Sequence, residues 1–152
     1  MNLVARTLGT WFGCGLVPRA PGTAGSLGAL PVYFLAWRVG GAWAVAGAAV
    51  VATVVGLWAS EIVARETKLK DPQIVVIDEV AGMLISLIPA TPHLATVAVA
   101  FVAFRVLDST KPWPIAPLER LPGGLGIMMD DVGAGLVSAG IVAVLRLGGV
   151  LP

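Results

Sequence analysis

The sequence predicts an all-α fold, a multihelical bundle embedded in a membrane. Three observations favour it: 57% of the 152 residues are hydrophobic and only 12% are charged, the mean hydropathy is +0.91, and long runs carry no charge. Soluble domains carry roughly 25% charged residues, so a freely soluble globule is disfavoured. Apolar runs of this kind are typical of helices in lipid. The length suits a single domain over 1–152.

The first half of the chain predicts two membrane helices after a short interfacial one. Residues 3–16 form the interfacial candidate, and a Pro-Gly break follows it. The stretch from Thr23 to Arg38 is uncharged until its end and predicts a membrane helix, and Gly40-Gly41 predicts a turn. Ala42 to Ser60 adds 19 uncharged residues, close to the roughly 20 that cross a hydrocarbon core.

The second half predicts three more apolar helices, which gives a bundle of about four to five. The polar interval from Glu61 to Asp71 is expected to be a loop. Asp71-Pro72 has the N-cap and first-turn signature of a helix that would run to Pro89. Leu94 to Leu107 predicts the fourth helix and Val132 to Leu145 the fifth.

Polar residues from distant segments are expected at one membrane face, as an acidic site. Short connections require antiparallel neighbours, and alternating helices would place eight of the ten Lys and Arg on that face. The positive-inside rule makes it cytoplasmic. The segments that meet there are Gly22-Thr23-Ala24-Gly25-Ser26, Asp78-Glu79, Arg105 to Lys111 and Asp130-Asp131.

Composition excludes several partners and chemistries. A net charge of +1 provides no attraction for nucleic acid. The single cysteine, Cys14, excludes an intrachain disulfide and a Cys-rich zinc site. The N-terminus lacks the apolar run and cleavage site of a secretory signal, so we expect it to be retained.

Two acidic pairs within apolar sequence predict a metal site. Buried carboxylates cost several kcal/mol unless they are paired or bound to metal, and oxygen ligands suit Mg²⁺. We therefore expect Asp78, Glu79, Asp130 and Asp131 to hold Mg²⁺. Two alternatives stay open: the first pair could lie at the aqueous end of its helix, and the second could stabilise a helix N-terminus against the macrodipole.

Two further clusters suit a phosphate group. Arg105, Asp108 and Lys111 are spaced by three, so a carboxylate would lie between two cations; a helix-terminal salt bridge is the alternative. The segment from Gly22 to Ser26 supplies free N–H groups and hydroxyls before an apolar helix, which favours anion binding, although such loops are common.

Other phosphatase chemistries lack their residues. The spacing from Cys14 to Arg19 is one residue short of a cysteine-phosphatase loop, and His93 is the only histidine and is expected near the opposite face. The chain has no phosphate-binding P-loop and no aspartyl-phosphate motif. Metal-assisted chemistry by carboxylates remains.

Four blocks of sequence, taken in order, resemble the bacterial phosphatidylglycerophosphatase A family. They are Gly22-Thr23-Ala24-Gly25-Ser26, Asp78-Glu79 with Gly82, Phe104 to Ile115 (FRVLDSTKPWPI), and Gly124 to Gly135 (GLGIMMDDVGAG). The resemblance runs from about residue 9 to residue 145. Leu16 to Pro21 and Glu61 to Gln73 match the family pattern less well, and we assign no function to them.

The resemblance implies a Mg²⁺-dependent, multi-pass enzyme of the bacterial inner membrane that acts in phospholipid biosynthesis. Such an enzyme removes the terminal phosphate of phosphatidylglycerophosphate and leaves phosphatidylglycerol and inorganic phosphate. It also implies a multihelical fold and relatives that can form homodimers.

These expectations give a mechanistic hypothesis. The acidic pairs would hold one or two Mg²⁺ ions, Asp108 would orient or deprotonate the water, and Arg105 and Lys111 would balance the phosphate. Thr23 and Ser26, with backbone N–H groups of the Gly22 and Gly25 segment, would cradle the phosphate. The expected catalytic residues are Asp78, Asp108, Lys111 and Asp131.

Three other functions are weighed against this one. A CDP-alcohol phosphotransferase would also use Mg²⁺ and membrane helices, but its Asp-Gly-x-x-Ala-Arg signature is absent. A cation carrier would spread polar residues through the span, whereas here they gather at one end. A purely structural membrane subunit would not need four acidic residues in apolar sequence.

Overall fold

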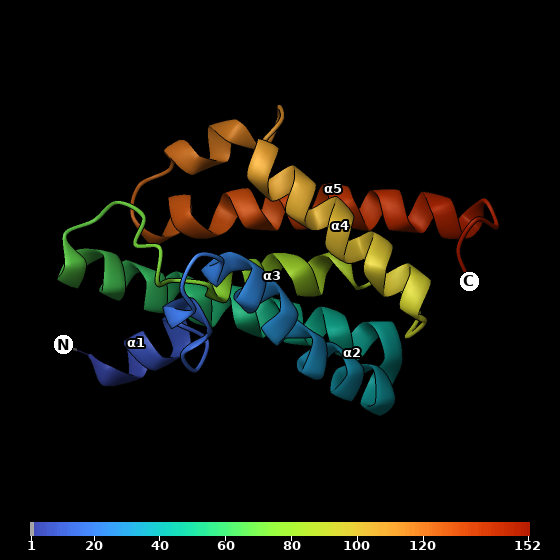
Figure 1. Ribbon diagram of the computed structural model, residues 1–152, viewed down its shortest axis with the longest axis horizontal. Helices are drawn as coiled ribbons and strands as arrows, with labels where there is room; N and C mark the ends of the chain where they lie inside the picture. The colour runs from blue at the N-terminus through green and yellow to red at the C-terminus, as the bar shows by residue number, and fades with distance from the viewer. Residues whose placement is uncertain (1) are drawn as a thin grey trace.

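The computed structural model describes residues 2–152, and this range is helical without strands. Figure 1 shows α5 and the returning arm of α2 along the long axis of the molecule, α4 crossing obliquely, and the short α3 in the middle of the bundle. The elements are α1 (Leu3–Gly9), the 3₁₀ turn η1 (Cys14–Leu16), α2 (Pro21–Thr67), α3 (Ile77–Ser86), α4 (Leu94–Thr110), the 3₁₀ turn η2 (Ala116–Arg120) and α5 (Gly124–Leu147). The all-α prediction is confirmed.

The first two predicted membrane helices are the two arms of α2. The helix is interrupted at Gly40 and Gly41, and Gly41 has φ 58, a left-handed conformation that glycine adopts without steric cost. Figure 1 shows the chain reversing there and returning along the bundle. Both arms bury small and apolar residues in one core, with Tyr33 from the first arm and Val45 from the second fully buried.

The predicted loop over 61–71 is wrong in its first part, because α2 continues to Thr67. Glu61 and Arg65 lie one helical turn apart and form an ion pair at 2.6 Å, an arrangement that supports a solvated helical turn. The helix ends where Lys68 adopts a left-handed conformation with φ 57. The first part of this polar segment is therefore the exposed C-terminal end of α2, and only the residues after Thr67 belong to a loop.

The start of α3 also differs from the prediction at Asp71-Pro72, because the helix begins at Ile77. The segment before it is tied to α1 by a hydrogen bond from Val76 N to Gly9 O of 2.9 Å. All ten residues of α3 except Glu79 are buried. At 1.5 Å per residue the helix is too short to cross a bilayer, and it serves as the centre of the core.

The N-terminus of α5 lies at Gly124, eight residues before Val132, where the predicted uncharged core of the fifth helix begins. Glu61 Oε2 accepts a hydrogen bond of 2.6 Å from Gly124 N, so the end of α2 caps α5. This places Asp130 and Asp131 inside a helix, and the alternative that they stabilise its N-terminus no longer applies.

Two helices, α2 and α5, are long and apolar enough to cross a membrane by length and composition. The fourth predicted helix is confirmed as α4, which begins at Leu94 and extends to Thr110. The predicted interfacial helix over 3–16 is divided into α1 and η1, with Trp11 and Phe12 at positive φ between them. A count of four to five spanning helices stays a prediction.

Three helices share a buried hydrogen-bonded seam. The hydroxyls of Ser86 in α3 and Ser138 in α5 lie 2.6 Å apart. Each also lies within hydrogen-bond distance of the carbonyl oxygen of Ala100 in α4, at 3.1 and 3.3 Å, so one hydroxyl donates to the other and the second donates to the carbonyl. The three polar groups satisfy one another within an otherwise apolar core.

Candidate functional site

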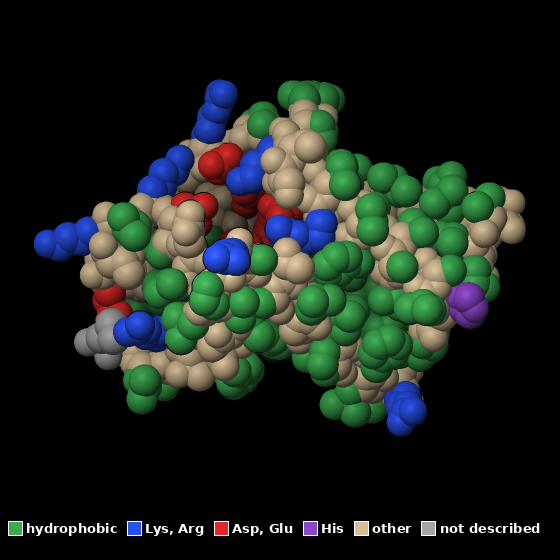
Figure 2. All heavy atoms as spheres, in the orientation of Figure 1, with side chains coloured by type: hydrophobic (Ala, Val, Ile, Leu, Met, Phe, Trp, Pro, Cys, Tyr) green, Lys and Arg blue, Asp and Glu red, His purple; other side chains and the backbone are tan. Residues whose placement is uncertain are grey.

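A cavity of about 450 Å³ opens at the end of the bundle where α3 and α5 begin and α4 ends. Figure 2 shows it as a hollow with acidic side chains inside and basic side chains around it. Its charged lining comes from five segments: Arg19, Asp71, Asp78, Glu79, Asp108, Lys111, Asp130 and Asp131. The structure therefore brings together both acidic pairs and two of the three residues of the predicted Arg-Asp-Lys cluster.

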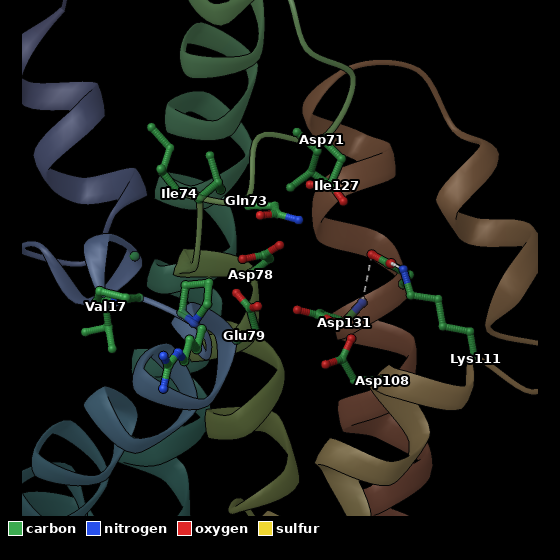
Figure 3. A pocket seen from close by; sticks show the side chains of 16 residues that line it. Val17, Asp71, Gln73, Ile74, Asp78, Glu79, Asp108, Lys111, Ile127 and Asp131 are labelled. Carbon is green, nitrogen blue, oxygen red and sulfur yellow. Dashed lines mark hydrogen bonds and ion pairs between the residues drawn. The ribbon is translucent and has the colours of Figure 1, made fainter.

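Three carboxylates form a compact group in the cavity. Asp78, Glu79 and Asp131 each place one oxygen within 4.8 Å of the other two. Asp78 is 8% exposed and Asp131 3%. Figure 3 shows Asp78 and Glu79 of α3 pointing across the cavity toward Asp131 of α5.

Within residues 2–152, part of the negative charge of this carboxylate group has no compensating partner. Asp78 Oδ1 and Glu79 Oε2 are buried without a hydrogen-bond partner. Burial raises the pKa of both carboxyls, and neighbouring negative charge, from Glu79 on Asp78 and from Asp108 on Glu79, raises the pKa values further. Buried acidic oxygens in this state require a cation or a proton, and an all-oxygen set fits Mg²⁺.

Asp130 belongs to a different arrangement from the other predicted metal ligands. Lys111 Nζ donates a hydrogen bond of 2.6 Å to Asp130 Oδ2 and lies 3.3 Å from Glu119 Oε2. Burial favours the neutral amine, but the hydrogen bond and charge of Asp130, together with Glu119, outweigh burial and raise the pKa of Lys111. Asp130 is thus paired with a cation and lies outside the group of three.

Asp108 lies beside the carboxylate group and is held by Arg105. Arg105 Nη1 donates to Asp108 Oδ2 at 2.6 Å, one helical turn away on α4. Arg105 does not line the cavity. It lies close to Gly22, because a β-carbon added to Gly22 would be 3.3 Å from the guanidinium nitrogens of Arg105 and would collide with Glu79. The predicted salt bridge is therefore present at Asp108, and the catalytic role of this residue stays a prediction.

The predicted phosphate cradle lies in the first turn of α2 and not in a loop. Ser26 is fully buried, and its hydroxyl donates to Gly22 O at 2.9 Å. Gly25 packs on α3, since a β-carbon there would be 2.8 Å from Val76 Cβ. Pro21 lines the cavity, but Thr23 and Ser26 do not. The structure does not bring the two hydroxyls to the carboxylates.

Two loops that sequence analysis left without a function form the remaining wall. One runs from Gly15 to Arg19 and the other from Asp71 to Val75, and most of both segments line the cavity. Neither has the apolar periodicity that marks a helix. The signal available in the sequence is Arg19, which the charge count places on the predicted cytoplasmic face but which no motif identifies as a site residue.

The family model for phosphatidylglycerophosphatase A matches residues 7–146, which is nearly the whole chain. The chain belongs to the phosphatidylglycerophosphatase A family. Membership makes it a phosphatase, and it confirms the resemblance that the sequence blocks predicted.

Curated relatives cover most of the chain. It is 40% identical over 141 residues to Phosphatidylglycerophosphatase A of Escherichia coli strain K12, covering 89% of this chain and 79% of the relative. It is 38% identical over 146 residues to a Bacteroides thetaiotaomicron protein provisionally named phosphatidylinositol-3-phosphatase, covering 91% of each. The Haemophilus influenzae Phosphatidylglycerophosphatase A is 31% identical over 142 residues, covering 91% of this chain and 86% of the relative. No solved structure matches the chain.

Proposed function

We propose that the chain hydrolyses the terminal phosphate monoester of phosphatidylglycerophosphate, with Mg²⁺, and releases phosphatidylglycerol and inorganic phosphate. The observation that carries the proposal is the group of three buried carboxylates with two unpartnered oxygens. It lies in a cavity that also presents Lys111 and Arg19. Family membership and the names of two relatives support the substrate.

Asp78, Glu79 and Asp131 would hold the metal. Bound there, Mg²⁺ supplies Lewis-acid chemistry, which stabilises negative charge on phosphate oxygens. Two positive charges there also offset most of the charge of the three clustered carboxylates, which lets a phosphate dianion approach a site that would otherwise repel it.

Asp108 is the proposed base. Its Oδ2 is fixed by Arg105, so the carboxylate is oriented and can take a proton from the attacking water. A phosphorus–oxygen bond forms to that water while the bond to the glycerol oxygen breaks, and Asp108 can return its proton to the departing oxygen. Lys111, kept protonated by Asp130 and Glu119, adds positive charge near the phosphate.

The surface supports a place in the bacterial cell membrane. Large apolar side chains are exposed along α2 and α5, including Trp43 at 88% and Leu147 at 90%. Figure 2 shows apolar side chains over the part of the bundle away from the acidic hollow. We propose a multi-pass chain with the cavity on the cytoplasmic side, where the positive-inside rule places it. The homodimer implied by the resemblance stays a prediction.

The gathering of polar groups argues against a cation carrier. Within residues 2–152, the ionisable side chains away from the cavity end are Tyr33, Arg38, His93 and Arg146, and Arg38 and His93 are exposed. A carrier would need ionisable groups along the route, and in the part of the chain that the structure describes the interior between the two ends supplies only hydroxyls and apolar side chains.

Phosphate release from purified protein in neutral detergent tests the proposal. Phosphatidylglycerophosphate and phosphatidylinositol 3-phosphate are offered separately, each with Mg²⁺ or with EDTA. We expect Mg²⁺-dependent release from the first lipid, and a loss of about 100-fold or more in Asp131→Asn. Preference for the inositol lipid would overturn the substrate assignment.

Glu66→Gln is the matched control, because Glu66 lies outside the cavity and accepts a hydrogen bond from Asn2 N that glutamine can keep. It should retain wild-type activity. Folded wild-type protein that releases no phosphate with any divalent metal would overturn the proposed function.

A further inference from the structure

Arg19 is a cavity-lining cation without a carboxylate partner in the part of the chain that the structure describes. The other lining cation, Lys111, is paired with Asp130 at 2.6 Å and with Glu119 at 3.3 Å. Nearby Arg105 is paired with Asp108 at 2.6 Å. Of these three cations, Arg19 alone has its charge available for a ligand.

Arg19 lies at the mouth of the cavity, and the carboxylate group lies at its floor. Residues 16–20 are all exposed, whereas Asp78 and Asp131 are 8% and 3% exposed. Figure 3 shows Val17 of the same loop on the opposite side of the cavity from Lys111. A ligand whose reacting phosphate reaches the floor can therefore place its next chemical group near Arg19.

The loop that carries Arg19 is fixed in place. At its base, a β-carbon on Gly15 would lie 2.8 Å from the carbonyl carbon of Ile74, so the two cavity walls touch through backbone. Pro18 and Pro21 restrict the chain on both sides of Arg19. The backbone at Arg19 is thus held beside the cavity, which suits recognition of a specific group more than general attraction to a charged surface.

The proposed substrate has an anionic group at the matching position. Phosphatidylglycerophosphate carries two phosphates, the terminal monoester that is hydrolysed and the phosphodiester that joins the headgroup to the lipid. With the monoester at the floor of the cavity, the phosphodiester lies toward the mouth. Guanidinium groups bind phosphate oxygens through paired, charge-assisted hydrogen bonds.

We propose that Arg19 binds the phosphodiester of the lipid substrate and so favours lipids that carry a second phosphate beyond the one removed. This inference rests on the proposed function and deepens it. It assigns substrate selection to a loop at the cavity mouth and leaves the hydrolytic step to the carboxylates and Asp108.

The two reaction products, used as inhibitors, test the two phosphate-binding positions separately. Phosphatidylglycerol contains the phosphodiester alone, and inorganic phosphate contains neither lipid nor diester. In neutral detergent micelles, Arg19→Gln should raise the KM for phosphatidylglycerophosphate and the inhibition constant of phosphatidylglycerol about tenfold each, the loss expected for a hydrogen bond to a charged group. The kcat and the inhibition constant of inorganic phosphate should stay within about twofold.

Two further variants sharpen the test. Arg19→Lys keeps the positive charge but lacks the planar guanidinium that can donate two parallel hydrogen bonds. It should show a smaller rise in KM than Arg19→Gln. Arg38→Gln removes an exposed arginine next to the Gly40–Gly41 reversal of α2, outside the cavity lining, and should match the wild type. Replacing phosphatidylglycerol by diacylglycerol at a constant lipid-to-detergent ratio controls for dilution of the substrate in the micelle.

Three outcomes would overturn the assignment of Arg19. They are a KM for Arg19→Gln equal to that of Arg38→Gln, an inhibition constant of inorganic phosphate that rises together with KM, and an effect confined to vesicles rich in anionic lipid. A wild-type protein that releases no phosphate from phosphatidylglycerophosphate is a distinct result, and it would overturn the proposed function and the role of Arg19 together.

Discussion

Gly82 of α3 and Gly135 of α5 lie backbone against backbone. A β-carbon on Gly135 would be 3.1 Å from both the Cα and the carbonyl carbon of Gly82. A β-carbon on Gly82 would be 2.6 Å from the carbonyl oxygen of Asp131. Because Asp78 and Glu79 lie one turn before Gly82, this contact sets the distance between the two parts of the carboxylate group.

Gly82→Ala should therefore separate the helices and reduce both activity and stability. We expect phosphate release to fall by about tenfold or more and the free energy of unfolding by about 1–3 kcal/mol, as for an overpacked core. Denaturation in detergent and steady-state kinetics measure the two effects. Gly47→Ala is the matched control, since a β-carbon there has no neighbour within 4 Å; equal effects at both sites would contradict the prediction.

Stability without metal should depend on pH through the carboxylate group. The pKa values of Asp78 and Glu79 are raised above 3.8 and 4.5 in the folded protein, so the folded state binds more protons than the unfolded state. In EDTA, the free energy of unfolding should therefore fall as pH rises above about 4.

Saturating Mg²⁺ should reverse that loss. Binding at 100 times the dissociation constant stabilises a protein by about 2.7 kcal/mol, which thermal unfolding at pH 7 with Mg²⁺ or EDTA would detect. Asp78→Asn should be more stable than the wild type in EDTA and less responsive to Mg²⁺. Equal melting temperatures for wild-type protein in Mg²⁺ and EDTA would argue against a cation at these carboxylates.

The pair formed by Lys111 and Asp130 should show strong coupling. Asp130 is 5% exposed, so Lys111→Gln leaves a buried charge without its partner and should cost about 1–3 kcal/mol of stability. Asp130→Asn in the same chain should recover most of that loss. A double-mutant cycle on unfolding measures the coupling.

Activity separates a structural role of this pair from a catalytic one. If Lys111 contributes charge to the phosphate, the double variant should regain stability and remain poorly active. Recovery of both properties together would show that Lys111 only holds the loop after α4 in place.

Glu61 should stabilise the start of α5 as a cap supplied by another helix. Glu61→Ala removes the acceptor for Gly124 N and should lower the free energy of unfolding by about 1 kcal/mol, as for loss of an N-cap. Glu61→Gln keeps an oxygen acceptor and should recover part of it. Hydrogen exchange of the first turn of α5 would report the local effect, and unchanged protection in Glu61→Ala would contradict the cap.

Sequence patterns predicted the parts of this molecule that depend on local chemistry. Uncharged runs located both arms of α2 and most of α4, and adjacent acidic residues in apolar sequence pointed to Asp78, Glu79 and Asp131. The start of α5 could not be predicted in this way, because its cap comes from Glu61, 63 residues away. The partners of Lys111, which are Asp130 and Glu119, likewise depend on how separate elements meet, and no spacing along the chain encodes that.

The hydroxyl seam among α3, α4 and α5 has a consequence for alignment. Ser86, Ser138 and the Ala100 carbonyl satisfy one another only when the three helices are neither shifted along their axes nor rotated. Apolar side chains tolerate a slip of one turn, but a stranded hydroxyl in this core costs about 1–3 kcal/mol. The seam lies away from the cavity, but it fixes how the three helices are aligned. It therefore keeps the carboxylates of α3 and α5 at matching positions.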